Sequence, residues 1–144
     1  MIMSIIVISY VLSIYSVNTA LSSIHFLSLP YGETTIINIG GIVYMIDTGG
    51  SRKEKDNIHI VQKIILPFLQ KINIQKIDVL ILTHDDIDHT GAAKELLKSI
   101  DITTIYLTVQ SEEEPEYQAI IDAEQKMITI IRVEQQLTLQ HLVL

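Results

Sequence analysis

Short stretches of alternating hydrophobic and polar residues follow a long apolar segment at the N-terminus. Residues 23–29 (SIHFLSL) alternate, and the β-branched stretches 34–39 (TTIINI) and 42–47 (IVYMID) follow, separated by the turns PYGET and GG. Alternation with a period of two and glycine-containing turns is typical of half-buried strands. The sequence therefore predicts β-hairpins between residues 23 and 47.

The next part of the chain changes to a helical period. Residues 57–72 place their apolar side chains along one helix face, with Asn57 as the expected N-cap and Pro67 expected to kink or divide the helix. The continuous apolar run 77–82 (IDVLIL) is typical of a strand buried on both faces. Beyond it we expect a helix in residues 91–100, a strand in 103–109, an acidic loop and helix in 112–126, and strands in 127–133 and 137–144. Hairpins followed by strand–helix–strand units predict an α/β domain (α+β layered), with a mixed sheet and helices on at least one face.

The first 24 residues carry no formal charge and are long enough to cross a bilayer as a helix. We predict a transmembrane helix in residues 1–22, followed by one domain in residues 23–144. A cleaved signal peptide is a competing interpretation, but it lacks the usual basic start; a buried helix or strand pair in a soluble core is a third. The first basic residue is Arg52, which favours a domain on the extracellular side of the cell membrane.

Composition excludes several classes of site. The 144 residues include no cysteine, so disulfides, zinc fingers and cysteine nucleophiles are excluded. The formal net charge is −7, and no basic stripe is visible in the sequence. This charge balance does not favour a dedicated nucleic-acid-binding module.

A crowded turn follows the buried strand of residues 77–82. His84, Asp86, Asp88 and His89 form the pattern H-x-D-x-D-H within six residues. Carboxylates this close repel one another unless a cation lies between them, and the mixed nitrogen and oxygen donors suit zinc, manganese or iron. Two ions bridged by oxygen would use the set and activate a water for hydrolysis. In the alternative interpretation these are solvated loop residues, with Asp85 or Asp86 capping the next helix.

The remaining histidines have simpler interpretations. His141 lies on the last expected strand, where a core or edge position is favoured over a ligand role. His25 and His59 have apolar neighbours and no acidic partner nearby in the sequence. We expect all three to be structural.

The motifs MIDTGG (45–50) and ILPFLQKINIQKIDVLILTHDDIDHTGA (65–92) resemble the metallo-β-lactamase fold. More narrowly, they resemble the C-terminal domain of ComEC-type DNA internalization competence proteins, which are membrane channels for DNA uptake. The resemblance implies a partial αββα fold preceded by one transmembrane helix. It covers residues 24–107 well and the remainder loosely.

The resemblance also implies roles for individual residues. His84 and Asp86 would hold a first metal, and Asp88 and His89 a second, with Asp88 as the catalytic residue. Asp47 would support the metal loop from the neighbouring strand through hydrogen bonds. The cofactors would be two divalent metal ions, zinc or manganese. The implied activity is hydrolysis of phosphodiesters in the DNA strand that is not imported, with the membrane, single- or double-stranded DNA, the channel helices and the competence machinery as partners.

Some features depart from the family pattern. Glu33 stands where an aspartate is usual, and Ala92 where a second glycine is usual. The later T-G-D aspartate and distal histidine of the family have no counterpart before Leu144, so we expect the N-terminal half of the domain with incompletely coordinated metals. Alternatives are a catalytically inactive membrane-attached remnant, half of a split gene product, or a superfamily hydrolase of another substrate class.

Overall fold

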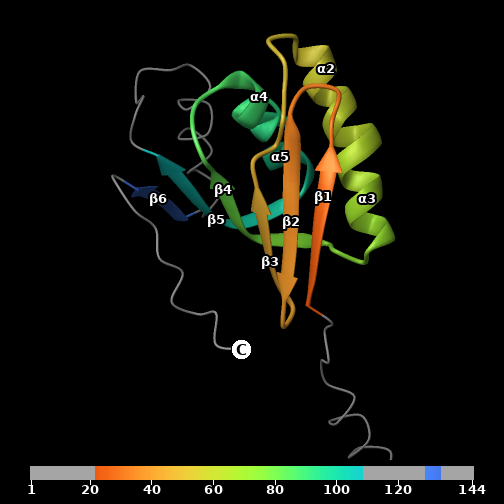
Figure 1. Ribbon diagram of the computed structural model, residues 1–144, viewed down its shortest axis with the longest axis vertical. Coiled ribbons are helices and arrows are strands. Elements are labelled where there is room, and N and C mark those ends of the chain that lie inside the picture. The colour runs from red at the N-terminus through yellow and green to blue at the C-terminus, as the bar shows by residue number, and fades with distance from the viewer. Residues whose placement is uncertain (1–21, 109–128, 134–144) are drawn as a thin grey trace, which may run out of the picture.

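A single mixed β-sheet organises the chain (Figure 1). The computed structural model describes residues 22–108 and 129–133. Within them the sheet has six strands in the order β1-β2-β3-β4-β5-β6. The strands are β1 Ser23–Ser28, β2 Glu33–Ile39, β3 Ile42–Ile46, β4 Lys76–Leu82, β5 Asp101–Thr108 and β6 Thr129–Val133. The first three are antiparallel neighbours, and β3 to β6 run parallel. The predicted hairpins followed by strand–helix–strand units, and the α/β class, are confirmed.

The described helices lie in the connections from β3 to β4 and from β4 to β5. They are α2 Glu54–His59, the π-helical segment η1 Ile60–Ile65, α3 Leu66–Lys71, α4 Ile87–Thr90 and α5 Ala93–Ser99. The helical run from α2 to α3 joins β3 to β4, and α4 and α5 join β4 to β5. A tight turn reverses the direction of the chain, so it joins antiparallel strands only. Parallel strands need a longer crossover connection, which is usually helical.

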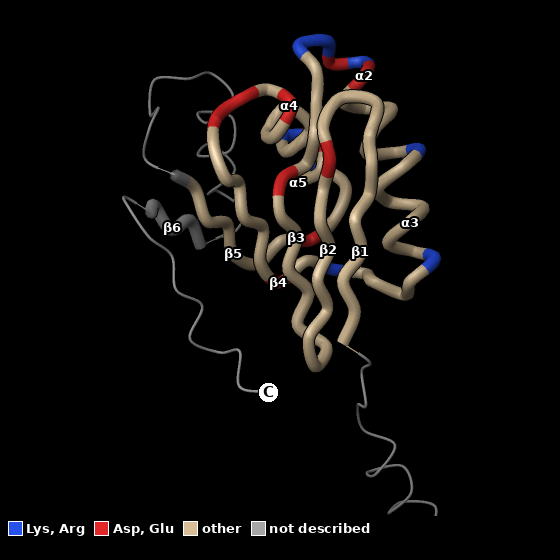
Figure 2. Tube along the Cα trace, in the orientation of Figure 1, with Lys and Arg blue, Asp and Glu red and all other residues tan. Residues whose placement is uncertain are grey.

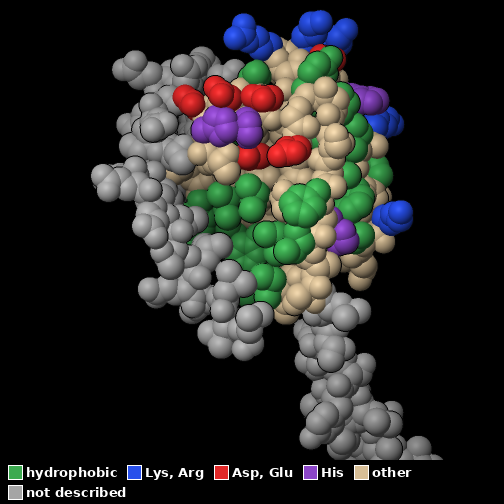
Figure 3. Space-filling view, in the orientation of Figure 1, with side chains coloured by type: hydrophobic (Ala, Val, Ile, Leu, Met, Phe, Trp, Pro, Cys, Tyr) green, Lys and Arg blue, Asp and Glu red, His purple; other side chains and the backbone are tan. Residues whose placement is uncertain are grey.

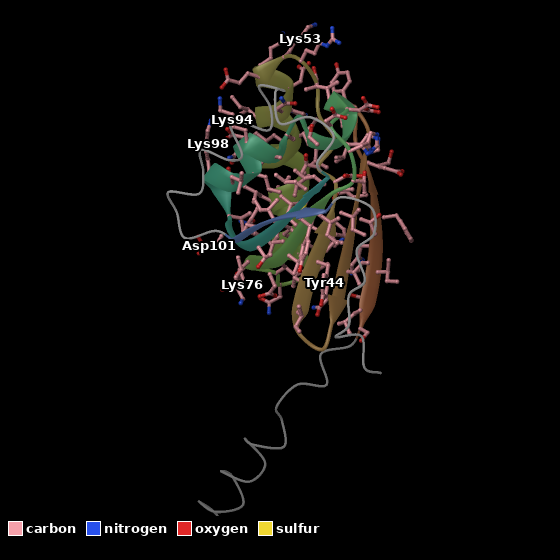
Figure 4. All side chains as sticks on the ribbon, turned by 90° about the vertical axis from the view of Figure 1, so that its left-hand side faces the viewer. Tyr44, Lys53, Lys76, Lys94, Lys98 and Asp101 are labelled. Carbon is pink, nitrogen blue, oxygen red and sulfur yellow. The ribbon has the colours of Figure 1, made fainter. Side chains whose placement is uncertain are left out.

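The core lies between the helices and one face of the sheet (Figure 4). Ile36, Met45 and Leu80 contribute fully buried side chains from the sheet. Val61 and Leu96 contribute fully buried side chains from the helices. Each such side chain stabilises the fold by roughly 1.5–3 kcal/mol relative to an exposed position. This core holds the ends of β3 and β4 in place. Asp47 follows β3 directly, and the candidate ligands His84 to His89 follow β4.

The opposite face of the sheet is exposed and apolar at its β1 side. His25 and Leu27 point to the helices, because His25 contacts the ring of Phe68 with a centroid separation of 5.4 Å and Leu27 packs against the core. The alternate residues Ile24 and Phe26 therefore point away, and they are 60% and 81% exposed. Figure 3 shows hydrophobic side chains gathered on this face below the acidic and histidine side chains.

Two details of the first helix differ from the sequence prediction. The helix begins at Glu54 rather than near Asn57. Asn57 is not the N-cap: its side chain accepts a hydrogen bond from the Ser51 backbone N–H (2.8 Å) and donates one to the Ser51 carbonyl (2.9 Å). The sequence predicts that Pro67 kinks or divides the helix; the backbone stays helical through Ile65 and Leu66, but the helix type changes there, from the π-helical segment η1 to the α-helix α3 that begins at Leu66. The π-helical turn precedes Pro67, and the Leu66 N–H bonds the carbonyl of Val61 five residues back. A proline lacks the N–H that a regular α-helical turn would need at this point.

Several predictions lie outside the described residues. These are the transmembrane helix of residues 1–22 (apart from Ser22), the helix within 112–126, and the strand 137–144 with His141. Within residues 22–108, no helix combines the length and the apolar composition that crossing a bilayer requires. The membrane helix and the domain boundary at residue 23 stay predictions.

Candidate metal centre

Three loops meet at the carboxyl ends of β3 and β4. They are the β1–β2 turn (29–32), the loop after β3 (47–50) and the loop and helix after β4 (83–91). Backbone hydrogen bonds join them directly: Thr48 N–H donates to the His89 carbonyl (2.8 Å), and Gly50 N–H to the Tyr31 carbonyl (2.8 Å). Ligand sites in α/β folds collect at this edge of the sheet. The D-T-G-G and H-x-D-x-D-H motifs are thus brought into contact.

Glycines allow this close approach. A side chain on Gly32, which has a φ of 89°, would collide with the carbonyl oxygen of Asp88. A Cβ on Gly50 would lie 2.5 Å from the Cα of Gly91. Real Cβ atoms do not approach backbone atoms so closely, so these positions require glycine.

Asp47 connects the loops through its carboxylate. It is buried (7% exposed) and has a left-handed backbone with φ 57°, a conformation that aspartate tolerates better than most residues. Its Oδ1 accepts from Thr83 N–H (2.9 Å), and its Oδ2 lies 2.8 Å from both Thr83 Oγ1 and His89 Nδ1. Its own carbonyl accepts the hydroxyl of Thr34 at 2.7 Å. The Asp47 side chain thus makes hydrogen bonds to Thr83 and His89 of the loop after β4, and its supporting role for a metal stays a prediction.

The rings of His84 and His89 lie side by side. Their centroids are 3.7 Å apart with an interplanar angle of 46°. Their side chains are 38% and 26% exposed, so both rings reach solvent. In Figure 3 histidine side chains lie among acidic side chains at this end of the sheet.

Each histidine has an aspartate facing its Nε2 atom. His84 Nε2 lies 3.4 Å from Asp86 Oδ2, and His89 Nε2 lies 3.8 Å from Asp88 Oδ2. Both separations are too long for a good hydrogen bond. They are close to the separation of roughly 3.4 Å between two ligands of a tetrahedral zinc ion with bonds near 2.1 Å. The pairs are also those that the resemblance assigns to the first and the second metal.

The donor chemistry fits divalent metals, but each pair supplies only two ligands. Among the described residues, no three histidine or acidic side chains gather around one point. The carboxylates of Asp86 and Asp88 are 73% and 56% exposed, so they have room to rotate. Asp86 occupies the N-cap position of α4 but makes no side-chain cap hydrogen bond. The capping interpretation therefore does not account for its carboxylate.

The loop contains no basic residue (Figure 2). Within the described residues, Asp47, Asp86 and Asp88 form ion pairs only with histidines. Among the described residues, only histidines balance these acids, an arrangement that a bound cation would complete.

Thr83 is a site residue that the sequence did not reveal. Its backbone N–H and hydroxyl both contact Asp47, and its hydroxyl also lies 2.9 Å from His84 Nδ1. In the sequence it looks like the last β-branched residue of a strand. Its position directly before the first histidine is a signal that the sequence contains, whereas its alignment with Asp47 on the adjacent strand is visible only in the structure.

A cleft of about 290 Å³ lies beside α4, between the loop after β3 and helix α5. Its polar lining includes the cations Arg52, Lys94 and Lys98 and the acids Glu54 and Glu95. Lys98 is paired with Glu95 at 3.3 Å. The side chains of Arg52 and Lys94 make no hydrogen bond or ion pair with another described residue. Figure 4 shows Lys94 and Lys98 along α5.

Three comparisons relate the chain to known proteins. Residues 30–135 match the sequence profile of the family described as the metallo-beta-lactamase superfamily. ComE operon protein 3 of Bacillus subtilis (strain 168) is 32% identical over an alignment of 87 positions, and the match covers 55% of this chain and 11% of that protein. A solved structure titled "Peroxy diiron species of chemotaxis sensor ODP" aligns with a TM-score of 0.52 and 15% identity, over 81% of this chain and 43% of that one. The chain thus spans about a tenth of the curated relative and less than half of the solved structure.

Proposed function

Because the chain belongs to the metallo-β-lactamase superfamily, we propose that its loop after β4 binds divalent metals for hydrolysis of nucleic-acid phosphodiesters. The predicted likeness to ComEC-type proteins is confirmed by the Bacillus subtilis relative. That relative is matched over a small part of its length, so a role in DNA uptake is part of the proposal.

One observation carries the proposal: two histidine–aspartate pairs with the spacing of metal ligands. His84 with Asp86, and His89 with Asp88, place an imidazole nitrogen and a carboxylate oxygen 3.4 and 3.8 Å apart. Asp47 holds the His89 ring in place from the neighbouring strand. Ring orientation by such a partner is a recurring feature of protein metal sites.

A divalent ion held here would lower the pKa of a water molecule and supply the nucleophile for the reaction. The protein side chains position the reactants. The adjacent rings of His84 and His89 would supply imidazole nitrogens as metal ligands. The carboxylates of Asp86 and Asp88 add negative charge beside them. We assign Asp88 to the reaction because its exposed carboxylate can hold an ion and orient a water at the scissile phosphate.

The cations that line the cleft beside α4 support the proposal of a polyanionic substrate. Arg52 and Lys94 have no anionic partner among the described residues, and the cleft is also lined by Thr90 and Gly91 of the metal loop. A phosphate backbone entering the loop would pass close to these cations. Local contacts of this kind are compatible with the negative charge of the whole chain, because phosphate contacts act over a Debye length of about 10 Å.

We also propose that residues 1–22 form a membrane helix, with the domain on the extracellular side. The uncharged N-terminal sequence and the absence of basic residues before Arg52 support this placement. The partners would then be the remaining channel helices and the DNA strand that is not imported. Membrane fractionation of cells producing the full chain, followed by protease protection of intact cells, tests both points.

A non-catalytic membrane-attached module is the second candidate. It is favoured by the finding that no three potential ligands converge within the described residues. Metal ions would then bind weakly or not at all.

Metal titration and cleavage assays separate the two candidates. The full chain, in detergent micelles, is titrated with Zn²⁺, Mn²⁺ and Fe²⁺ by calorimetry; iron is included because the solved relative is titled as a diiron species. We expect tight binding that His84→Ala or His89→Ala abolishes, and metal-dependent cleavage of labelled single- or double-stranded DNA. His59→Ala, a histidine outside the loop, is the matched control and should behave as the wild type. Tight binding without cleavage of either DNA would overturn the substrate assignment, and no binding would favour the non-catalytic module.

A further inference from the structure

The hydroxyl of Thr83 lies between the carboxylate of Asp47 and the ring of His84. Its Oγ1 is 2.8 Å from Asp47 Oδ2 and 2.9 Å from His84 Nδ1. Thr83 is an exposed residue, so it is not needed to fill the core. Two short polar contacts at an exposed threonine point to a role in orienting its neighbours.

Counting protons determines the direction of both hydrogen bonds. An ionised carboxylate only accepts, and a hydroxyl has a single proton to donate. The proton of Thr83 Oγ1 must therefore point to Asp47, since otherwise two acceptors would face each other at 2.8 Å. Because that proton is used, the 2.9 Å contact to His84 requires His84 Nδ1–H to donate to Thr83 Oγ1.

The same count applies to the second histidine. His89 Nδ1 lies 2.8 Å from Asp47 Oδ2, which can only accept, so the His89 ring also carries its proton on Nδ1. A neutral ring with a proton on Nδ1 has its lone pair on Nε2. These Nε2 atoms face Asp86 and Asp88 without a hydrogen bond.

We propose that Thr83 is a positioning residue that fixes the tautomer and orientation of His84. The Asp47 carboxylate contacts the Thr83 hydroxyl and the ring of His89, and the Thr83 hydroxyl contacts the ring of His84. Together these contacts fix the orientation of both rings, with each Nε2 directed to the side where a ligand can bind. The tautomer assignment concerns the metal-free protein. Its use for metal binding rests on the proposed function, because only a neutral imidazole nitrogen can be a ligand.

A purely structural role for Thr83 makes a different prediction. In that case Thr83 would only close the end of β4 through its backbone N–H, which every non-proline residue has. Replacing the hydroxyl would then change stability but not the proton position on His84. The tautomer is therefore the deciding observable.

The test is nitrogen-15 NMR of histidine-labelled full chain in micelles, with chelator, at a pH where the rings are neutral. For the wild type we expect His84 and His89 both protonated on Nδ1. Thr83→Val, which removes the hydroxyl and keeps the shape, should move His84 toward the Nε2-protonated form and leave His89 unchanged. Thr83→Ser should restore the wild-type spectrum. A wild-type His84 protonated on Nε2, or a His84 signal that Thr83→Val does not move, would overturn the inference.

Metal affinity gives a second measurement. By calorimetry we expect Thr83→Val to weaken Zn²⁺ or Mn²⁺ binding about 10–100-fold, as for other partners of metal-binding histidines, and Thr83→Ser to bind within a few-fold of the wild type. Thr35→Val, the same chemical change on a β2 threonine whose hydroxyl makes no hydrogen bond to a described residue, should leave binding unchanged. If the wild type has the expected tautomers but binds no metal, the proposed function fails and the tautomer inference stands. Equal affinity in wild type and Thr83→Val would overturn the role of Thr83 in metal binding.

Discussion

The carboxylates at the two ends of strand β4 have different partners. Near its beginning, Asp78 is 2.7 Å from the ammonium group of Lys76 and accepts the Val43 backbone N–H at 2.8 Å. Beyond its end, Asp86 and Asp88 face only histidines within the described residues, at 3.4 and 3.8 Å. Asp78 thus has a lysine partner, whereas no described lysine or arginine pairs with Asp86 or Asp88.

The difference distinguishes a structural carboxylate from a candidate functional one. Burial alone raises the pKa of Asp78, but the hydrogen bonds from Lys76 and Val43 and the charge of Lys76 outweigh it and hold the pKa below its usual value. Among the described residues, the carboxylates of Asp86 and Asp88 have no comparable hydrogen bonds and no lysine or arginine partner. Sites that break a local rule of stability, while the rest of the fold obeys it, are where function is expected.

The largest expected effect comes from two glycines that have nearly the same positive φ at opposite ends of the sheet. Gly32 (φ 89°) packs on the loop and helix after β4 (residues 83–91), whereas Gly41 (φ 90°) in the β2–β3 hairpin has open space around it. Gly41→Ala should cost about 1 kcal/mol for its left-handed backbone. Gly32→Ala should cost at least about 2 kcal/mol more, because its Cβ would collide with the carbonyl of Asp88. Denaturant unfolding of both variants measures the difference.

Equal destabilisation of the two glycine variants would show that the β1–β2 turn can move away from Asp88. The close packing of three loops would then not be required. A Gly32→Ala variant that folds should also bind metals more weakly than Gly41→Ala, since the loop would be displaced.

Added metal should stabilise the protein only by binding to the loop and helix after β4 (residues 83–91). At a free metal concentration of one hundred times Kd, the expected gain in unfolding free energy is about 2.7 kcal/mol. Thermal unfolding with Mn²⁺ or Zn²⁺ and with chelator measures it. His89→Ala should lose the gain, because one of the two ligand pairs is removed. Asp78→Asn, at the opposite end of β4, should keep it. A gain that Asp78→Asn loses and His89→Ala keeps would contradict the assignment of the metal site.

Most of the fold could be predicted from the sequence, because local periodicity determined it. The alternation of residues 23–47 and the apolar run 77–82 predicted the strands that the structure contains. The helix start was missed because Asn57 bonds to Ser51 in the preceding loop instead of capping the helix. The π-helical turn was missed because a proline can be accommodated in more than one way.

The candidate site was only partly predictable. The histidines and aspartates of the loop are close in sequence, so their spacing was visible. The contact between Thr83 and Asp47 joins residues 36 positions apart, and it depends on the parallel register of β3 and β4. No local pattern encodes that register, so the role of Thr83 required the structure.

A moderate effect is expected from the cations beside the loop. Lys94→Gln should weaken binding of single-stranded DNA in chelator about 3–10-fold, and it should reduce the slope of log K against log salt by roughly 0.7. Fluorescence anisotropy at several salt concentrations measures both quantities. Lys71→Gln, at the end of α3, is the matched control and should leave both unchanged. Equal losses for the two lysines would indicate general charge attraction instead of binding in the cleft.

The smallest expected effect concerns the paired carboxylate at the beginning of β4. Because the pKa of Asp78 is lowered in the folded state, its stabilising contribution is fully present above the unfolded value near 3.9 and is lost as the pH falls through the folded value. Lys76 is 62% exposed, so the contribution should be below about 1 kcal/mol. Asp78→Asn should therefore be slightly less stable than the wild type at pH 6. The difference should shrink toward zero as the pH falls below the unfolded pKa and through the lowered folded-state pKa, where the native carboxylate becomes protonated. Denaturant unfolding of both proteins from pH 3 to 7 in chelator measures this, and a difference that grows on acidification would show that Asp78 is destabilised in its ionised form.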